Sequence, residues 1–136
     1  MRLSIQSYAL SIAQAAAARS EDPFLQVGCT LIRYDGTVAA TGYNGAPPGI
    51  DIDWTVREAR RGKVIHAEAN ALRYVKPHEV SFVATTVMPC QECVRAIASY
   101  GIDQVYYIDE LPAEYHDIPA VVKLATEFGI VMTQIK

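Results

Sequence analysis

Two short polar motifs, one on each side of an apolar run, constrain the fold of this chain more than any other feature. His66-Ala67-Glu68 precedes the β-branched stretch from Val80 to Val87, and Pro89-Cys90-Gln91-Glu92-Cys93 follows it almost directly. A short apolar run rich in β-branched residues predicts a buried strand. For the two motifs to form one site, the fold must place the end of this strand beside His66.

The two motifs together supply one imidazole, two thiols and one carboxylate. Cys90 follows the expected strand and Cys93 lies about one turn into a helix, whose N-terminus favours thiolates. With His66 they offer three ligands to a zinc ion and leave a fourth position for water, whose pKa falls towards about 7. Glu68, offset from His66 by about 200° on an ideal helix, is the candidate proton carrier.

Two other interpretations of these residues are open. A C-x-x-C can be a redox dithiol, although that chemistry does not call for a histidine ligand nearby. A structural zinc site needs a fourth ligand, for which only Cys29, His78 and His116 remain. Cys29 alternates with its neighbours in an expected strand and fits a small core residue. The open, three-ligand site is the favoured interpretation.

Size and composition limit what else the chain can contain. Its 136 residues, 51% of them apolar and 20% charged, predict one domain over residues 1–136. The net charge of −3 argues against a nucleic-acid partner, which is usually met by a basic face. The sequence has no apolar run of about 18 residues and its three cysteines do not resemble a secreted disulfide framework, so we expect a cytoplasmic protein without a membrane partner.

Hydrophobic periodicity and turn residues predict alternating helices and strands. Asp35-Gly36 predicts a hairpin turn and Gly101 the left-handed end of a helix. Because helices and strands alternate in the second half, the expected fold class is α/β: a three-layer α/β/α sandwich with a mixed sheet of about five strands and helices on both faces. The expected helices are 4–19, 67–74, 93–100 and 118–128, and the expected strands are 27–34, 37–43, 80–87, 104–108 and 130–135.

Two polar segments precede the first motif. Gly42 to Gly49 is so dense in glycine and proline that it predicts a shaped loop, either a plain surface connection or a binding element. Asn44 favours binding, because its amide both donates and accepts hydrogen bonds. Residues 51–63 contain a basic cluster, which is usually a solvated face and alternatively reads a phosphate.

Five motifs occur in order from about residue 20 to about residue 110: Asp22-Pro23, Val27-Gly28, Gly42-Tyr43-Asn44-Gly45 with Pro47 and Gly49, His66-Ala67-Glu68-Ala69-Asn70-Ala71, and Pro89-Cys90 with Cys93. The H-x-E and P-C-x-x-C pair is the signature of zinc-dependent nucleobase deaminases in general. The Gly-Tyr-Asn-Gly loop joined to His-Ala-Glu-x-Asn-Ala narrows the likeness. The set resembles the deoxycytidylate (dCMP) deaminases of the cytidine/deoxycytidylate deaminase superfamily, which implies a cytidine deaminase-like fold.

The resemblance implies hydrolytic removal of the 4-amino group of dCMP, giving dUMP for thymidylate synthesis and ammonia. It implies one zinc ion per chain, held by His66, Cys90 and Cys93, with Glu68 as the catalytic proton shuttle. Alternatives are another small zinc deaminase, acting on tRNA adenosine or on a free base or nucleoside, and a catalytically silent zinc- or nucleotide-binding protein. Glu68 argues against a silent protein, because a structural site does not need that carboxylate.

By the same resemblance, the backbone at Ala67 reads the pyrimidine, Asn44 hydrogen-bonds the deoxyribose 3′-hydroxyl and Tyr115 packs near the nucleotide. The candidates for holding the phosphate are His116, Arg57, Arg60 and Gln26. The family also implies a homohexamer that dCTP activates and dTTP inhibits at a site between subunits. Asn44 and Gly45 are the candidate effector residues. The short segment before His66 has no further Cys or His cluster, so no second, structural zinc is expected.

Overall fold

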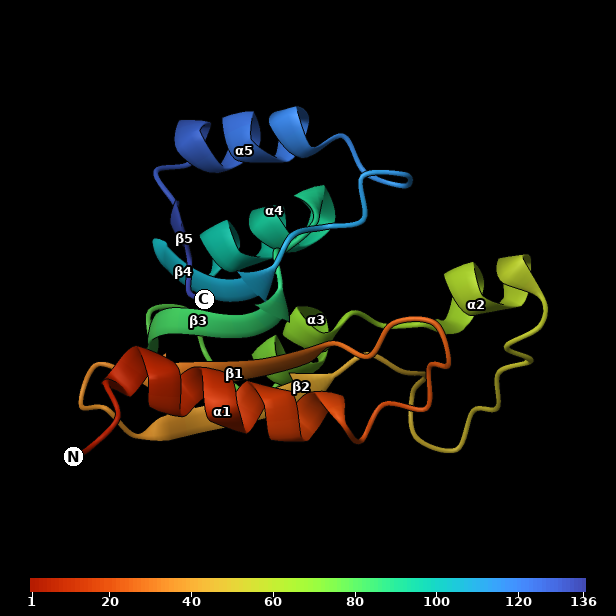
Figure 1. The fold of residues 1–136 in the computed structure, drawn as a ribbon, viewed down its shortest axis with the longest axis horizontal. Coiled ribbons are helices and arrows are strands. Elements are labelled where there is room, and N and C mark those ends of the chain that lie inside the picture. The colour runs from red at the N-terminus through yellow and green to blue at the C-terminus, as the bar shows by residue number, and fades with distance from the viewer.

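In the computed structural model, which describes residues 1–136, helices cover both faces of one five-stranded sheet (Figure 1). This arrangement confirms the expected α/β sandwich. The strand order is β2-β1-β3-β4-β5. The helices are α1 (Ile5–Ala17), α2 (Arg57–Lys63), α3 (Ala67–Leu72), α4 (Gln91–Ser99) and α5 (Ile118–Glu127), and the strands are β1 (Gly28–Arg33), β2 (Val38–Tyr43), β3 (Val80–Val87), β4 (Gln104–Asp109) and β5 (Val131–Gln134).

The sheet is mixed, and β3 is its central strand. β1 runs antiparallel to both β2 and β3, whereas β3, β4 and β5 are mutually parallel. Seven of the eight residues of β3 are buried, which explains the continuous β-branched run in its sequence. The positive φ of Gly36 and of Gly101, 86° and 75°, confirms the expected hairpin turn and helix end.

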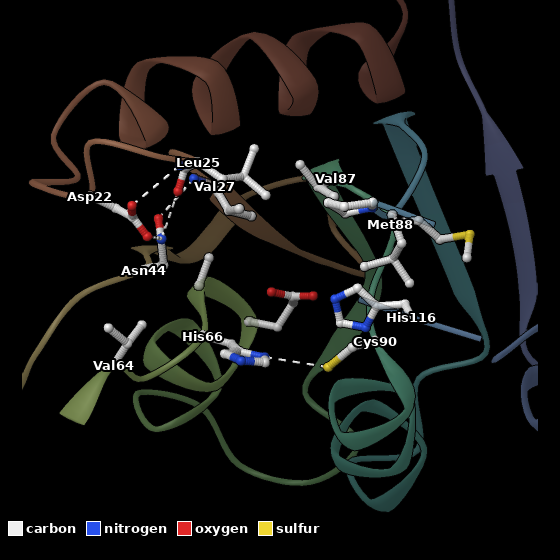
Figure 2. A pocket seen from close by; sticks show the side chains of 14 residues that line it. Asp22, Leu25, Val27, Asn44, Val64, His66, Val87, Met88, Cys90 and His116 are labelled. Atoms are coloured by element: carbon white, nitrogen blue, oxygen red, sulfur yellow. Dashed lines mark hydrogen bonds between the residues drawn. The ribbon is translucent and has the colours of Figure 1, made fainter. Parts of the chain in front are cut away.

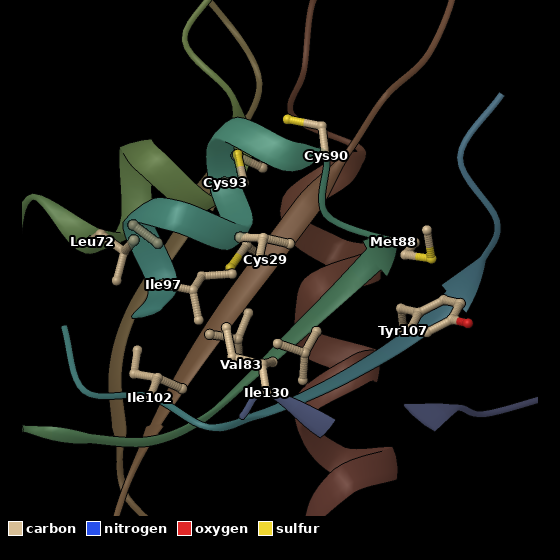
Figure 3. Close-up of a cluster of buried hydrophobic side chains, with 14 of the residues drawn as sticks. Cys29, Leu72, Val83, Met88, Cys90, Cys93, Ile97, Ile102, Tyr107 and Ile130 are labelled. Carbon is tan, nitrogen blue, oxygen red and sulfur yellow. The ribbon is translucent and has the colours of Figure 1, made fainter. Parts of the chain in front are cut away.

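The two faces of the sheet are covered unequally. On one face α1 packs alone, with Ala9 and Leu10 against Ile32 and Phe82. On the other face α3, α4 and α5 share a larger core of 21 buried residues, part of which is drawn in Figure 3. That larger core lies directly beneath both polar motifs, so it supports them from below.

Two glycines at neighbouring positions of the β1–β2 pair bring helices unusually close to the sheet. A Cβ at Gly28 would overlap the carbonyl oxygen of Ala13 in α1, and a Cβ at Gly42 would overlap that of Ala67 in α3. The Gly42 Cβ would also lie 2.7 Å from the Ala71 nitrogen, where no real Cβ fits. The start of α3 is therefore set by contact with β2 through a residue without a side chain.

The structure differs from the sequence expectation in one helix. α2 was expected as a polar segment and is a helix of seven residues with none buried. Its N-cap, Val56, makes no capping hydrogen bond through its side chain. A helix with neither an apolar stripe nor a capping side chain leaves no periodic signal in the sequence. None of the five helices is long and apolar enough to cross a bilayer.

Candidate active site

A cavity of about 200 Å³ opens where α3 and α4 begin, at the carboxyl end of β3 (Figure 2). Fourteen residues line it, and eight of them are hydrophobic. The lining comes from segments far apart in the sequence: Asp22, Leu25, Val27, Asn44, Val64, His66, Ala67, Glu68, Val87, Met88, Cys90, Leu111, Pro112 and His116. Both polar motifs of the sequence therefore meet in one chamber.

The three predicted metal ligands converge at the mouths of two helices. His66 is the N-cap of α3, Cys90 is the N-cap of α4, and Cys93 lies within the first turn of α4. Nδ1 of His66 is 3.4 Å from Sγ of Cys90 and 3.3 Å from Sγ of Cys93. The ligand atoms of all three lie within 4.8 Å of one another. We call these three residues the metal centre.

The donor set and spacing of the metal centre fit zinc. Bonds of about 2.1 Å to nitrogen and about 2.3 Å to sulfur at tetrahedral angles imply nitrogen–sulfur separations near 3.6 Å, close to those seen here. One imidazole and two thiolates make a catalytic type of site with an open position. Cys29 is fully buried in the core, and neither it nor His78 nor His116 joins the group, so no fourth ligand closes it.

Charges within the metal centre are arranged for a cation. The pKa of Cys90 falls to about 3, chiefly because the Cys93 thiol donates a hydrogen bond to its sulfur. The pKa of Cys93 is raised, because its proton is held in that bond and because the thiol is buried. The hydrogen bond to Cys90 raises the pKa of His66 to about 9. Since a metal must displace these protons, its affinity falls as the pH falls.

Glu68 lies one residue into α3 and points into the cavity. Its side chain is only 4% exposed, and no salt bridge neutralises it. Burial is the largest cause that raises its pKa to about 7. A carboxyl group whose pKa lies near the working pH both gives and takes a proton readily, as a general acid–base catalyst must.

Asn44 lines the same cavity and holds two loops together. Its Nδ2 donates to Oδ2 of Asp22 at 3.2 Å and to the Leu25 carbonyl at 2.9 Å, and its Oδ1 accepts from the Val27 nitrogen at 2.8 Å. The Asn44 carbonyl accepts from the hydroxyl of Ser20. The amide is thus largely used within the protein, and only a lone pair on Oδ1 is left for a ligand.

The other residues predicted to bind substrate divide into two groups. Ala67 and His116 line the cavity, whereas Tyr115 and Gln26 do not. Tyr115 is 64% exposed, and the Gln26 side chain donates to the carbonyl of Ser20. Gly45 instead lines a neighbouring polar hollow outside the cavity.

The two candidate arginines stand outside the cavity and are stacked on aromatic rings. The Arg57 guanidinium lies 5.4 Å from the centre of the Tyr115 ring, and that of Arg60 lies 4.1 Å from the centre of the Phe24 ring. Arg60 also donates to the Trp54 carbonyl at 2.8 Å. We call Arg57, Arg60, Tyr115 and Phe24 the arginine rim, because it joins α2 to both loops at the cavity mouth.

The structure adds lining residues that the sequence alone did not single out as site residues. Asp22 was noted only as part of a motif, and Leu25, Val64 and Leu111 were not considered. Asp22 stands next to a proline in a turn, where an aspartate usually has a local role. Its hydrogen bond to Asn44, 22 positions away, is visible only in the fold.

A mixed α/β sheet carrying a His-Cys-Cys metal centre beside a buried carboxylate defines a zinc-dependent deaminase type of domain. Residues 3–109 match the family model described as the cytidine and deoxycytidylate deaminase zinc-binding region. The chain belongs to the cytidine and deoxycytidylate deaminase family. The expectation of a zinc cofactor is thereby confirmed, since the family's zinc-binding region contains the metal centre.

Individual relatives agree with the family. The chain is 34% identical over 109 residues to the probable deoxycytidylate deaminase of Caenorhabditis elegans, covering 74% of this chain and 55% of that protein. It is 36% identical over 120 residues to the deoxycytidylate deaminase of Mycobacterium phage D29, covering 76% and 93%. The crystal structure of the cyanophage S-TIM5 dCMP deaminase with dCMP and dUMP shares the fold, with a TM-score of 0.77, 24% identity and 99% of both chains covered.

The animal relatives are longer than this chain. The chain spans 55% of the Caenorhabditis elegans protein and 61% of the Drosophila melanogaster probable deoxycytidylate deaminase. The phage D29 protein, by contrast, is spanned almost completely. The shared part includes the zinc-binding region, so the family assignment does not depend on the additional length.

Proposed function

We propose that the chain catalyses the hydrolytic deamination of dCMP to dUMP and ammonia, which supplies dUMP for thymidylate synthesis. The observation that carries the proposal is the buried Glu68 carboxyl group, with a pKa of about 7, in the same cavity as the metal centre. The deoxycytidylate deaminases among its relatives support the choice of substrate.

The chemistry divides between the metal centre and Glu68. His66, Cys90 and Cys93 would hold a zinc ion, which as a Lewis acid lowers the pKa of a bound water to about 7. Glu68 takes a proton from the attacking water and gives it to N3 of the cytosine. It then moves the second proton of that water to the 4-amino group, which leaves as ammonia while C4 keeps the oxygen.

The remaining lining residues hold the nucleotide. The backbone of Ala67 reads the pyrimidine edge, and Leu111 and Met88 belong to the hydrophobic lining that excludes water from it. Among the four candidates for the phosphate, His116 is the one that lines the cavity. Arg57 stands just behind it, over the ring of Tyr115. We assign the phosphate to His116, with Arg57 supplying positive charge at the mouth.

A panel of substrates tests the proposal. Zinc-loaded protein is incubated separately with dCMP, deoxycytidine, cytosine, dCTP and a tRNA anticodon stem containing the target adenosine, and ammonia release is measured. We expect dCMP to give the highest kcat/KM. Ammonia from any other compound in the absence of turnover of dCMP would reject the substrate assignment, while no ammonia from any of them would favour a silent binding protein.

Four further features belong to the same proposal and follow from the family alone. We propose that the chain is a single deaminase domain over residues 1–136, that it works in the cytoplasm without nucleic-acid or membrane partners, and that it assembles as a homohexamer. We also propose activation by dCTP and inhibition by dTTP, with Asn44 and Gly45 near the effector. Light scattering and dCMP saturation curves with each triphosphate test the last two features.

A further inference from the structure

The polar side chains of the cavity fall into two groups. Apart from the metal centre and Glu68, only Asp22, Asn44 and His116 line the cavity with polar side chains. Figure 2 shows Asp22 and Asn44 side by side, and His116 near Cys90 on the other side of the chamber. A nucleotide whose base lies at the metal centre therefore has three polar side chains to meet its sugar hydroxyl and its phosphate.

The hydrogen-bond donors of Asp22 and Asn44 are all used inside the protein. Both hydrogens of the Asn44 amide are donated, to Asp22 and to the Leu25 carbonyl. Oδ1 of Asp22 accepts from the nitrogens of Phe24 and Leu25, at 2.8 and 3.2 Å. What the pair offers to the cavity is therefore only acceptor lone pairs, on Oδ1 of Asn44 and Oδ2 of Asp22.

The carboxylate of Asp22 also brings an uncompensated charge to this wall. The single salt bridge in the structure joins Arg33 to Glu79, so no cation lies within 4 Å of Asp22. A wall that has acceptors and a negative charge binds a neutral donor such as a hydroxyl group. A phosphate has neither a free donor nor a compatible charge, and it is repelled.

We propose that the Asp22–Asn44 pair selects for a free hydroxyl group on the substrate sugar and rejects a phosphate at that position. The 3′-hydroxyl donates to the pair, and the 5′-phosphate is directed to the side of His116. The site thus accepts a mononucleotide and excludes nucleoside 3′,5′-bisphosphates and the internal nucleotides of a polynucleotide. Asp22 is the specificity-determining residue. This inference rests on the proposed deamination of dCMP, whose reactive base fixes the orientation.

Equilibrium binding of product analogues tests the inference without turnover. Zinc-loaded protein is titrated in a calorimeter with dUMP, with 2′-deoxyuridine 3′,5′-bisphosphate and with 3′-O-methyl-dUMP, whose methyl ether cannot donate. We expect the bisphosphate to bind at least about 30-fold more weakly than dUMP at low salt, with a smaller difference at high salt because the repulsion is screened. The methyl ether should bind about tenfold more weakly at any salt concentration.

A matched pair of variants isolates the charge of Asp22. Asp22→Asn keeps an oxygen to accept from Phe24 and Leu25 but removes the charge, and should narrow the ratio between bisphosphate and dUMP to about threefold. Glu21→Gln removes the same charge one residue away, at a side chain that faces the outer hollow and not the cavity. Its ratio should equal that of the wild type.

The outcomes separate this inference from the proposed function. If dCMP releases no ammonia and dUMP does not bind, the proposed function itself is wrong. If dCMP is deaminated but the wild type binds the bisphosphate within about threefold of dUMP, the inference is wrong and the function stands. An unchanged ratio in Asp22→Asn also overturns it. Should that variant fail to fold, the salt dependence and the methyl ether still decide the matter with the wild type.

Discussion

The metal centre and the arginine rim border the same cavity but are built in opposite ways. The metal centre stands on helix starts that rest on the larger core, and both of its cysteines are buried. The arginine rim is carried by a helix with no buried residue and is held by guanidinium–ring contacts. The chemistry is thus placed by packing, which tolerates little movement, whereas access is placed by surface contacts of small energy.

The largest expected effect is at the proton carrier beside the metal centre. Glu68→Gln keeps the shape of the side chain but cannot carry the proton, so kcat/KM for dCMP should fall by about 10³- to 10⁴-fold. Zinc content, measured by mass spectrometry, should equal that of the wild type, because Glu68 is not one of the ligands. Activity within tenfold of the wild type would reject the role of Glu68.

The second prediction concerns the stability of the protein treated with a chelator. Because burial raises the pKa of Glu68 to about 7 in the folded chain, from an ordinary 4.5, the folded state holds its proton more tightly than the unfolded state does. The stabilisation is complete below about pH 4.5 and is lost as the pH rises through about 7, a difference of at most about 3 kcal/mol.

Glu68→Gln has no such charge to bury. Urea unfolding at pH 5 and pH 8 should therefore show the chelator-treated wild type losing more stability than Glu68→Gln over this interval. Other groups titrate in both proteins, so the comparison cancels them. Parallel curves would mean that the folded protein accepts the charge of Glu68 at little cost.

The third prediction tests the close packing beneath the metal centre. Gly42→Ala adds a Cβ that overlaps the Ala67 carbonyl, so α3 must move away from β2. We expect a loss of about 1–3 kcal/mol of stability and, because Glu68 shifts with the helix, a fall of about 100-fold in kcat/KM. Gly62→Ala in α2 is the control, since nothing lies within 4 Å of its Cβ. Its stability and activity should be unchanged or slightly improved.

The smallest effect is expected at the arginine rim. Arg60→Ala removes the guanidinium from the Phe24 ring and its hydrogen bond to Trp54. Exposed contacts of this kind are worth about 0.5–1 kcal/mol. The KM for dCMP should rise by roughly two- to fivefold with kcat unchanged, because the contact shapes the mouth and not the chemistry. Arg61→Ala, on the same helix, should change neither. A large fall in kcat for Arg60→Ala would contradict the division of labour.

Much of the fold and of the metal centre could be predicted from the sequence because their signals are local. Asp35-Gly36 and Gly101 marked a turn and a helix end through a backbone that glycine adopts easily, and β3 stood out as a single apolar run. The spacing of Cys90 and Cys93 placed both sulfurs near a helix start. Each of these features involves residues within a few positions of one another.

The parts that were missed depend on contacts between distant segments. The role of Asp22 arises from its bond to Asn44, which no pattern around residue 22 reveals. Tyr115 was expected beside the nucleotide, but its ring lies beneath Arg57, a partner 58 positions upstream. α2 escaped detection because a helix that buries nothing needs no periodic sequence. Polar surface structure is chosen by the tertiary context, and short-range rules do not contain that context.

The central place of β3 in the sheet has a consequence for the order of folding. Its carboxyl end leads to Cys90, and its antiparallel partner is β1, where Thr30 pairs with Ala84. Pairing between residues so far apart in the chain forms slowly, because a long loop must close first. The full set of ligands thus assembles only after that loop closes. The disappearance of a coloured zinc–indicator complex during refolding would time the completion of the sheet.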